Sequence, residues 1–164
     1  KVFASVVEGR LSHWVARSEE QFGFEEGHGA RDNILVASSV FEQYSRLGLH
    51  CCFVDFKAAF DTIDREKLLR KLRQLGVQDK IVNLIASMYS NVAATVKGSD
   101  VRFVENQGVK QGDPLGPRLF NIFIKDLPRA LHMGGETCPA MLAGKIIRCL
   151  LYADDLLQIG RAHV

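Results

Sequence analysis

The 164-residue sequence lacks several features that would place it in a specialised class of protein. No apolar run approaches the length that spans a bilayer, and no N-terminal stretch has the pattern of a signal peptide, so we expect no membrane association. Internal repeats and low-complexity tracts are absent. Lys and Arg number 21 against 19 Asp and Glu, a balance that neither requires nor excludes a nucleic-acid partner. What remains is the composition of an ordinary globular domain with a sizeable core.

Cysteine is scarce, and the sequence does not begin with methionine. The four cysteines, Cys51, Cys52, Cys138 and Cys149, show no zinc-ligand spacing. Because Cys51 and Cys52 lie in an apolar run, we expect reduced thiols in the core. The chain starts at Lys1, inside a predicted helix, so we expect a fragment of a longer protein.

What the sequence does contain is organised around Tyr152-Ala153-Asp154-Asp155. Apolar runs at 146–151 and 156–157 flank it and predict two short buried strands with the aspartates at their turn. Two adjacent carboxylates in an apolar setting repel each other and are costly to bury. A bound divalent cation such as Mg²⁺ would relieve that cost. The alternative is a solvated hairpin turn, since Asp is a common turn residue.

The rest of the chain alternates between helical and strand periodicity. We expect a buried strand at 49–56 and a β-hairpin at 91–105. The Gly- and Pro-rich stretch 107–117 predicts a loop that a ligand could approach closely or that is only a turn. Helices are predicted at 1–17, 32–47, 65–75, 79–90 and from Pro117 to 127, and a second loop at 133–144. Trp14, Ile34, Val40, Phe41, Tyr44 and Leu47 are expected in the core.

Two features of the middle of the chain bear on chemistry. Asp55 stands at the end of the predicted strand, whereas Asp64 has the position of a helix N-cap. The helix at 65–75 is expected to face outward with five basic side chains that either contact phosphates or simply lie in solvent. These are Arg65, Lys67, Arg70, Lys71 and Arg73.

Three stretches, in order, resemble the palm motifs of reverse transcriptases. They are Phe53-Val54-Asp55-Phe56-Lys57-Ala58-Ala59-Phe60-Asp61, Gly108-Val109-Lys110-Gln111-Gly112-Asp113-Pro114-Leu115, and Tyr152-Ala153-Asp154-Asp155. Upstream, Gln21-Phe22-Gly23-Phe24 with Gly27 and Asp32 resembles a segment of the non-LTR (LINE-type) retrotransposon enzymes. The residues Lys57-Ala58-Ala59-Phe60-Asp61 after Asp55 also favour that branch. The resemblance covers residues 1–158, and the ordered set is far more specific than any one motif.

The resemblance implies a site. Asp55 and Asp154 would be the principal ligands of two Mg²⁺ ions, with Mn²⁺ as a substitute and Asp155 in support. Two such ions about 3.5–4 Å apart neutralise the attacking and leaving oxygens of phosphoryl transfer. Phe60 matches the steric gate that selects deoxynucleotides; without the motif around it, a core aromatic would be the expected role. Asp61 is expected to be structural. The nucleotide-binding set is Phe56, Ala59, Phe60, Gln111 and Gly112, and Tyr152 would lie near the primer end.

The implied fold is α+β, a right-hand polymerase palm with an antiparallel sheet, packed helices and partial fingers. Fingers would occupy about 1–48 and palm about 49–158. The implied function is RNA-templated DNA synthesis from dNTPs on a DNA primer, as part of a retrotransposon polyprotein. The thumb is expected to be missing and the fragment inactive alone. A eukaryotic element would act in nucleus and cytoplasm.

The sequence leaves several alternative protein classes open. Group II intron and diversity-generating reverse transcriptases are near rivals, and an RNA-dependent RNA polymerase or a decayed RNA-binding remnant are more distant ones. Asp55 with Asp61 also fits the RNA polymerase pattern, but Phe60 and Gln111-Gly112 argue against it. Two departures from the non-LTR pattern, Glu25 in place of Arg and His28-Gly29-Ala30 in place of a basic-hydroxyl pattern, predict weaker template contact by that loop.

The last six residues form a separate case. Ile159 to Val164 can be back-translated as ATC GGA AGA GCA CAC GTC, which resembles a common sequencing-library adapter, and Gln158 can be encoded CAG. We therefore expect 159–164 to be a non-native tail, poorly packed, with the natural sequence ending at or just before Gln158.

Overall fold

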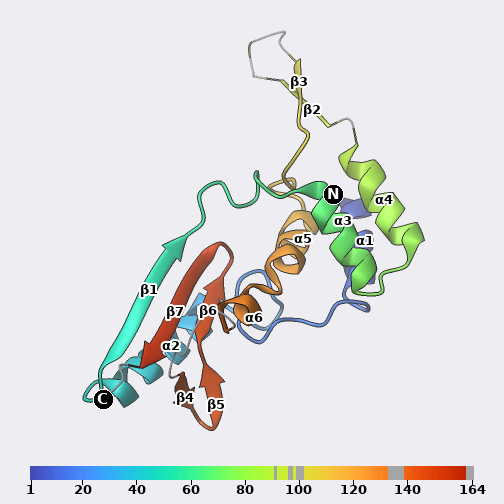
Figure 1. Cartoon of the computed structure of the whole chain (residues 1–164). Helices are drawn as coiled ribbons and strands as arrows, with labels where there is room; N and C mark the ends of the chain where they lie inside the picture. The colour runs from blue at the N-terminus through green and yellow to red at the C-terminus, as the bar shows by residue number, and fades with distance from the viewer. Residues whose placement is uncertain (91, 96–97, 99–101, 133–138, 162–164) are drawn as a thin grey trace. The chain divides into compact units, whose positions relative to one another are not determined.

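The computed structural model describes all residues except 91, 96–97, 99–101, 133–138 and 162–164 (Figure 1). The chain forms two compact units, each built from two separate stretches of sequence. The helical unit comprises residues 1–16 and 58–123, and the sheet unit comprises 17–57 and 124–164. None of the helices formed by the described residues is both long and apolar enough to cross a membrane.

The helical unit contains most of the predicted helices and the predicted hairpin. Its strands β2 (Ala93–Thr95) and β3 (Arg102–Val104) pair antiparallel, with Ala94 opposite Phe103. Buried leucines and aromatics, including Leu11, Leu72 and Phe120, form its interior. Its elements are α1 (Val2–Leu11), α3 (Arg65–Gln74), α4 (Asp79–Tyr89), β2 (Ala93–Thr95), β3 (Arg102–Val104) and α5 (Leu115–Ile124), whose last residue falls in the sheet unit.

The ends of these helices follow local capping chemistry. Asp64 caps α3 as predicted, because its carboxylate accepts a hydrogen bond from the Lys67 backbone N–H at 2.9 Å. Asp113 accepts one from Leu115 N–H, so α5 begins at Leu115 rather than at Pro117. The helix predicted at 1–17 ends at Leu11, where a turn follows, and Trp14 leaves the buried face and is 39% exposed. The prediction of a core Trp14 was wrong.

The sheet unit contains a three-stranded antiparallel sheet in the order β1 (Leu49–Asp55), β7 (Asp155–Arg161), β6 (Cys149–Tyr152), so β7 lies in the middle. A short hairpin of β4 and β5 occupies part of the predicted 133–144 loop and the start of the predicted 146–151 strand. Its elements are α2 (Ala30–Tyr44), β1 (Leu49–Asp55), α6 (Leu127–His132), β4 (Ala140–Leu142), β5 (Lys145–Ile147), β6 (Cys149–Tyr152) and β7 (Asp155–Arg161).

Alternation along the strands divides the sheet unit's core into two faces. On one face, Leu150, Leu157 and Ile159 pack with Val40 and Tyr44 of α2. On the other, Cys149, Leu151 and Leu156 pack with side chains of α6 and of the residues next to it. Helices therefore cover both faces of β6 and β7, which explains why these two strands are as apolar as predicted.

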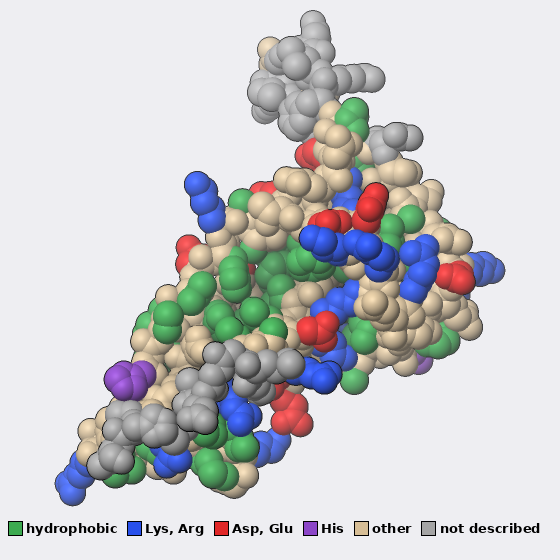
Figure 2. Space-filling view, in the orientation of Figure 1, with side chains coloured by type: hydrophobic (Ala, Val, Ile, Leu, Met, Phe, Trp, Pro, Cys, Tyr) green, Lys and Arg blue, Asp and Glu red, His purple; other side chains and the backbone are tan. Residues whose placement is uncertain are grey.

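Strand β1 is not buried as predicted. It is an edge strand, and Phe53 is 76% exposed, while Cys51 and Cys52 are exposed free thiols rather than core residues. Ile34, Phe41 and Leu47 are also exposed, contrary to expectation. In α2 the buried residues are Val40 and Tyr44, and Leu47 lies beyond the end of this helix. Hydrophobic side chains consequently reach the surface over the sheet unit (Figure 2).

The packing expected of the tail was also wrong for its described part. Strand β7 continues to Arg161, with Ile159 opposite Cys51 and Arg161 opposite Leu49. Ile159 is 2% exposed and belongs to the core face next to α2. Residues 162–164 lie outside the described residues, and the origin of the six-residue tail stays a prediction.

Candidate functional site

The turn between β6 and β7 presents the two adjacent aspartates. Tyr152 pairs with Asp155, and the Leu151–Leu156 and Leu150–Leu157 pairs follow down the hairpin. Asp154 in the turn is half-buried and Asp155 is exposed. The apolar burial expected for them was wrong: Asp155 shares a face with the buried Leu157 and Ile159, but it is the first residue of β7 and lines an open groove.

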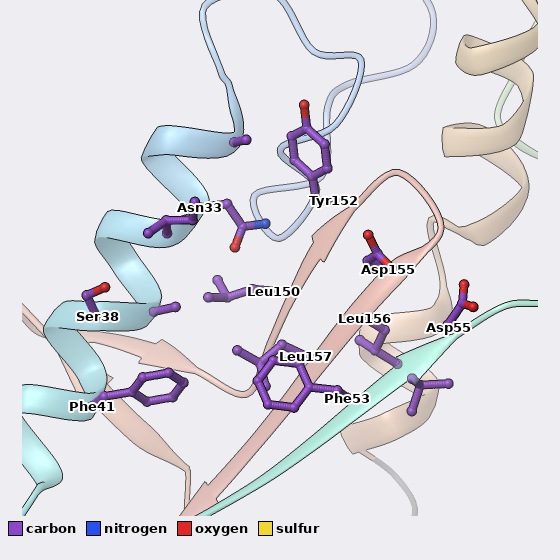
Figure 3. A pocket seen from close by; sticks show the side chains of 14 residues that line it. Asn33, Ser38, Phe41, Phe53, Asp55, Leu150, Tyr152, Asp155, Leu156 and Leu157 are labelled. Atoms are coloured by element: carbon purple, nitrogen blue, oxygen red, sulfur yellow. The ribbon is translucent and has the colours of Figure 1, made fainter.

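The register of β1 on β7 brings the third aspartate to the same place. Asp55, the last residue of β1, is directly opposite Asp155 in the antiparallel ladder. Side chains at opposite positions point to the same face, with Cβ atoms about 4.5–5.5 Å apart. Figure 3 shows the two carboxylates side by side, one from each strand. Asp55 and Asp155 thus lie opposite each other on one face of the sheet, and Asp154 precedes Asp155 in the turn.

The donor set suits a hard divalent cation. Within the described part of the chain, no Lys, Arg or His forms an ion pair with Asp55, Asp154 or Asp155. Carboxylate oxygens are ligands that Mg²⁺ prefers, and among these described residues no basic side chain competes for them. The described residues nonetheless contain no ready-made group of three or more His, Cys, Asp or Glu side chains placed to hold a metal. Asp55, Asp154 and Asp155 stay the candidate ligands, as predicted from the sequence.

An apolar groove of about 610 Å³ runs beside this pair (Figure 3). Its walls are α2 on one side and the sheet on the other, and it ends at the two carboxylates. Tyr152, which is 38% exposed, also lines it. The labelled lining residues include Asn33, Ser38, Phe41, Phe53, Leu150, Leu156 and Leu157.

The predicted nucleotide-binding residues divide between the two units. Phe60 is half-buried in the helical unit and stacks on Phe120, with ring centroids 4.4 Å apart and planes 18° apart. Ala59 beside it is buried. Phe56 belongs to the sheet unit, where it packs against the face that carries Leu151 and Leu156.

Gln111 and Gly112 are exposed on the loop before α5. The Gln111 side-chain N–H donates to the Asp61 carboxylate at 3.2 Å, which gives Asp61 a contact with a predicted nucleotide-binding residue. Gly108 opens this loop with φ 82° and lies so close to Asp61 that a Cβ would come within 2.7 Å of its carbonyl oxygen. Only glycine fits there, so the close approach holds the loop against the chain around Asp61.

Arg65 has a role that the sequence did not reveal. Its guanidinium donates to the carbonyl oxygens of Gly108, Gln107, Glu105 and Tyr89, and it lies 5.3 Å from the centre of the Tyr89 ring. The expectation that Arg65 faces outward was wrong, because these carbonyls converge on it. Lys71 likewise donates to the Phe123 carbonyl. Through its bonds to Gln107 and Gly108, Arg65 fixes the backbone that leads into the loop at 110–112.

The charge change at Glu25 also has a structural basis. Glu25 is 7% exposed, and its carboxylate lies 3.1 Å from Arg17 Nε. Glu25 therefore forms an ion pair inside the protein, and the weaker template contact expected of this loop stays a prediction.

Comparison with known proteins points to one family. The family model for reverse transcriptase (RNA-dependent DNA polymerase) matches residues 1–163. A Pol polyprotein of the R2 retrotransposable element of Popillia japonica is 37% identical over 113 residues, which are 65% of this chain and 18% of the relative. The RNA-directed DNA polymerase of the mobile element jockey of Drosophila funebris is 33% identical over 150 residues, 87% of this chain and 15% of the relative.

The chain therefore spans less than a fifth of the length of these relatives. Among solved structures, apo telomerase from Candida tropicalis superposes with a TM-score of 0.57 over 96% of this chain and 33% of that one. At 14% identity this likeness concerns the fold alone, and it confirms the predicted α+β right-hand polymerase architecture.

Proposed function

Because the chain belongs to the reverse transcriptase (RNA-dependent DNA polymerase) family, we propose that it contributes the metal-binding part of an enzyme that copies RNA into DNA. The observation that carries the proposal is the register that sets Asp55 opposite Asp155, next to Asp154. The reaction would extend a DNA primer with dNTPs on an RNA template. The retrotransposon names of the relatives support a place in such an element's polyprotein.

In this proposal Asp55, Asp154 and Asp155 hold two Mg²⁺ ions, for which Mn²⁺ can substitute. When bound, the ions supply charge neutralisation at the attacking and leaving oxygens. The residues of the chain orient the reactants. Asp55 and Asp154 would be the principal ligands, and Asp155, the cross-strand neighbour of Asp55, would support them.

The other predicted residues take positioning roles in the same proposal. Phe60, held by its stack on Phe120, would lie under the sugar and exclude a 2′-OH, with Ala59 beside it. Gln111 and Gly112 would contact the incoming nucleotide, and Phe56 would support the Asp55 strand end from its apolar cluster. Tyr152, exposed at the groove, would lie near the primer end.

The test is primer extension on an RNA template with dNTPs and Mg²⁺, using the longer protein that carries this chain. Asp154→Asn removes charge but little volume, so we expect kcat to fall by about 10²-fold or more with thermal stability unchanged. Asp79→Asn, which alters an exposed carboxylate in the helical unit, is the matched control. Near-normal extension by Asp154→Asn would refute the assignment of the site.

A further inference from the structure

The turn that carries the aspartates has an unusual backbone. Ala153 adopts φ 55°, in the left-handed region that residues with a Cβ rarely enter. Ala153 is also buried, with 9% exposure. Such a conformation persists only when its surroundings determine it.

One side chain satisfies both backbone polar groups of Ala153. The Gln21 amide donates through Nε2 to the Ala153 carbonyl at 3.1 Å, and its Oε1 accepts from the Ala153 N–H at 3.0 Å. Oε1 also accepts from Gly23 N–H at 2.7 Å. Gln21 lies 132 residues from Ala153 in sequence and is only 4% exposed. A buried amide with its donor and acceptor so used has little freedom to move.

The residues around Gln21 continue the contact. Phe22 N–H donates to the Leu151 carbonyl at 2.9 Å, and Leu151 N–H donates to the Glu20 carbonyl at 2.8 Å. Residues 20–23, here called the Gln21 segment, thus lie along β6 and end against the turn. Asn33 of α2 adds a bond from its side-chain N–H to the Leu151 carbonyl at 3.1 Å.

Gly23 lies against the turn so closely that no side chain fits. A Cβ built on Gly23 would come within 2.2 Å of Ala153 N and 2.9 Å of its Cα. Backbone atoms cannot move aside as a flexible side chain can, so any larger residue at 23 must displace the turn. The segment therefore fixes Ala153 by hydrogen bonds from Gln21 and by direct packing from Gly23.

We propose that Gln21 and Gly23 are positioning residues for the metal-binding carboxylates. Gln21 hydrogen-bonds the Ala153 backbone and Gly23 packs against it, and through this backbone they set the directions in which Asp154 and Asp155 point. The inference rests on the proposed function, because it assumes that these aspartates bind metal. Groups that orient metal ligands typically change metal affinity about 10- to 100-fold when they are removed.

The test measures Mn²⁺ binding to the chain by electron paramagnetic resonance of the free ion, a readout that needs no polymerase activity. Gln21→Met removes both bonds to Ala153 at similar volume, and we expect Mn²⁺ affinity about 10-fold weaker or more. Gln21→Glu keeps the acceptor but loses the donor, and an intermediate loss is expected. Hydrogen exchange of the Ala153 amide should quicken in Gln21→Met, since its acceptor is gone.

Tyr44→Phe is the matched control for a merely structural role. The Tyr44 hydroxyl is bonded to the Met141 backbone, so its loss also removes buried hydrogen bonds from the sheet unit, on another element pair. We expect Tyr44→Phe to lower thermal stability and to leave Mn²⁺ affinity unchanged. Equal weakening by Tyr44→Phe and Gln21→Met would show that general destabilisation is responsible and would overturn the inference.

The results distinguish a failure of the positioning role from a failure of the proposed metal site. If Mn²⁺ binds the unaltered chain, Asp154→Asn abolishes binding and Gln21→Met does not weaken it, the positioning role is wrong and the metal site stands. If the unaltered chain binds no Mn²⁺, both fall. Gly23→Ala provides a second variant, and its Mn²⁺ affinity should fall with that of Gln21→Met; normal affinity in a folded Gly23→Ala protein would also overturn the inference.

Discussion

At the scale of single residues, the stack of Phe60 on Phe120 makes the sugar-selecting role testable. The buried Phe120 supports one face of Phe60, so the ring has limited freedom to tilt away from a bound nucleotide. Phe60→Val removes the ring, and we expect incorporation of ribonucleotides relative to deoxyribonucleotides to rise about 10-fold or more. Single-nucleotide insertion assays with matched NTP and dNTP series measure the ratio.

The control for that prediction is Phe3→Val. Phe3 lies on α1 of the same unit and is 55% exposed, so its loss should leave the ratio unchanged. An unaltered ratio in Phe60→Val would mean that Phe60 only packs against Phe120. A preference for NTPs in the unaltered protein would instead favour an RNA-dependent RNA polymerase.

The cysteines give a residue-scale prediction about chemical reactivity. Burial, reinforced by the nearby Glu20 charge, raises the pKa of the Cys149 thiol to about 12. A raised pKa keeps the thiol protonated, so at pH 8 only about one in 10⁴ Cys149 side chains is the reactive thiolate. We expect N-ethylmaleimide to label the exposed Cys51 and Cys52 but not Cys149 until denaturant is added, as read by peptide mass spectrometry. Labelling of Cys149 in the native protein at the rate of Cys52 would contradict this.

At the scale of elements, the sequence predicted the kinds of helix and strand better than their burial. Alternation in 91–105 and the capping residue Asp64 are local signals, and both features formed as expected. The exposure of β1 depends on strand order and on which faces the helices cover, and periodicity within 49–56 contains neither. A short apolar run therefore predicted a strand correctly and its burial wrongly.

Strand β7 gives the element-scale prediction. Ile159 is buried between α2 and the sheet, so Ile159→Ala should lower the free energy of unfolding by about 2–4 kcal/mol. Ile34→Ala, at a site 63% exposed, should change it by less than about 0.5 kcal/mol. Urea denaturation followed by circular dichroism measures both. If Ile159→Ala is as mild as Ile34→Ala, the end of β7 is loosely packed after all.

The candidate site shows the same division between local and distant information. Asp55, Asp154 and Asp155 were predicted from motifs that are short and ordered along the chain, and the register of β1 on β7 places Asp55 opposite Asp155. Their role as metal ligands stays a prediction. Arg65 and Gln21 act on backbone groups far away in sequence, and nothing in their own neighbourhood specifies those partners. Only the fold shows that an arginine on a basic helix holds a loop, or that a glutamine holds a turn.

At the scale of the whole molecule, the fraction of the relatives that this chain spans leads to the last prediction. These 164 residues on their own should not extend a primer, whereas a longer protein that carries them should, because template and primer need further binding surface. Gel-based primer extension compares the two at equal concentration. Extension by the 164-residue chain alone would contradict this.

The origin of residues 159–164 has a separate test. The coding DNA of these residues would show whether they match the adapter string.

The central place of β7 in the sheet has a consequence for how the protein comes to be folded. During synthesis, β1 emerges from the ribosome well before the strand that will pair with it, because Asp155 follows its partner Asp55 by 100 residues (155 − 55). Until then the backbone hydrogen-bonding groups of β1 have no partner strand. Pairings between such distant segments also form slowly. The nascent chain thus passes through a period in which an unpaired apolar strand is open to misassembly or to capture by a chaperone.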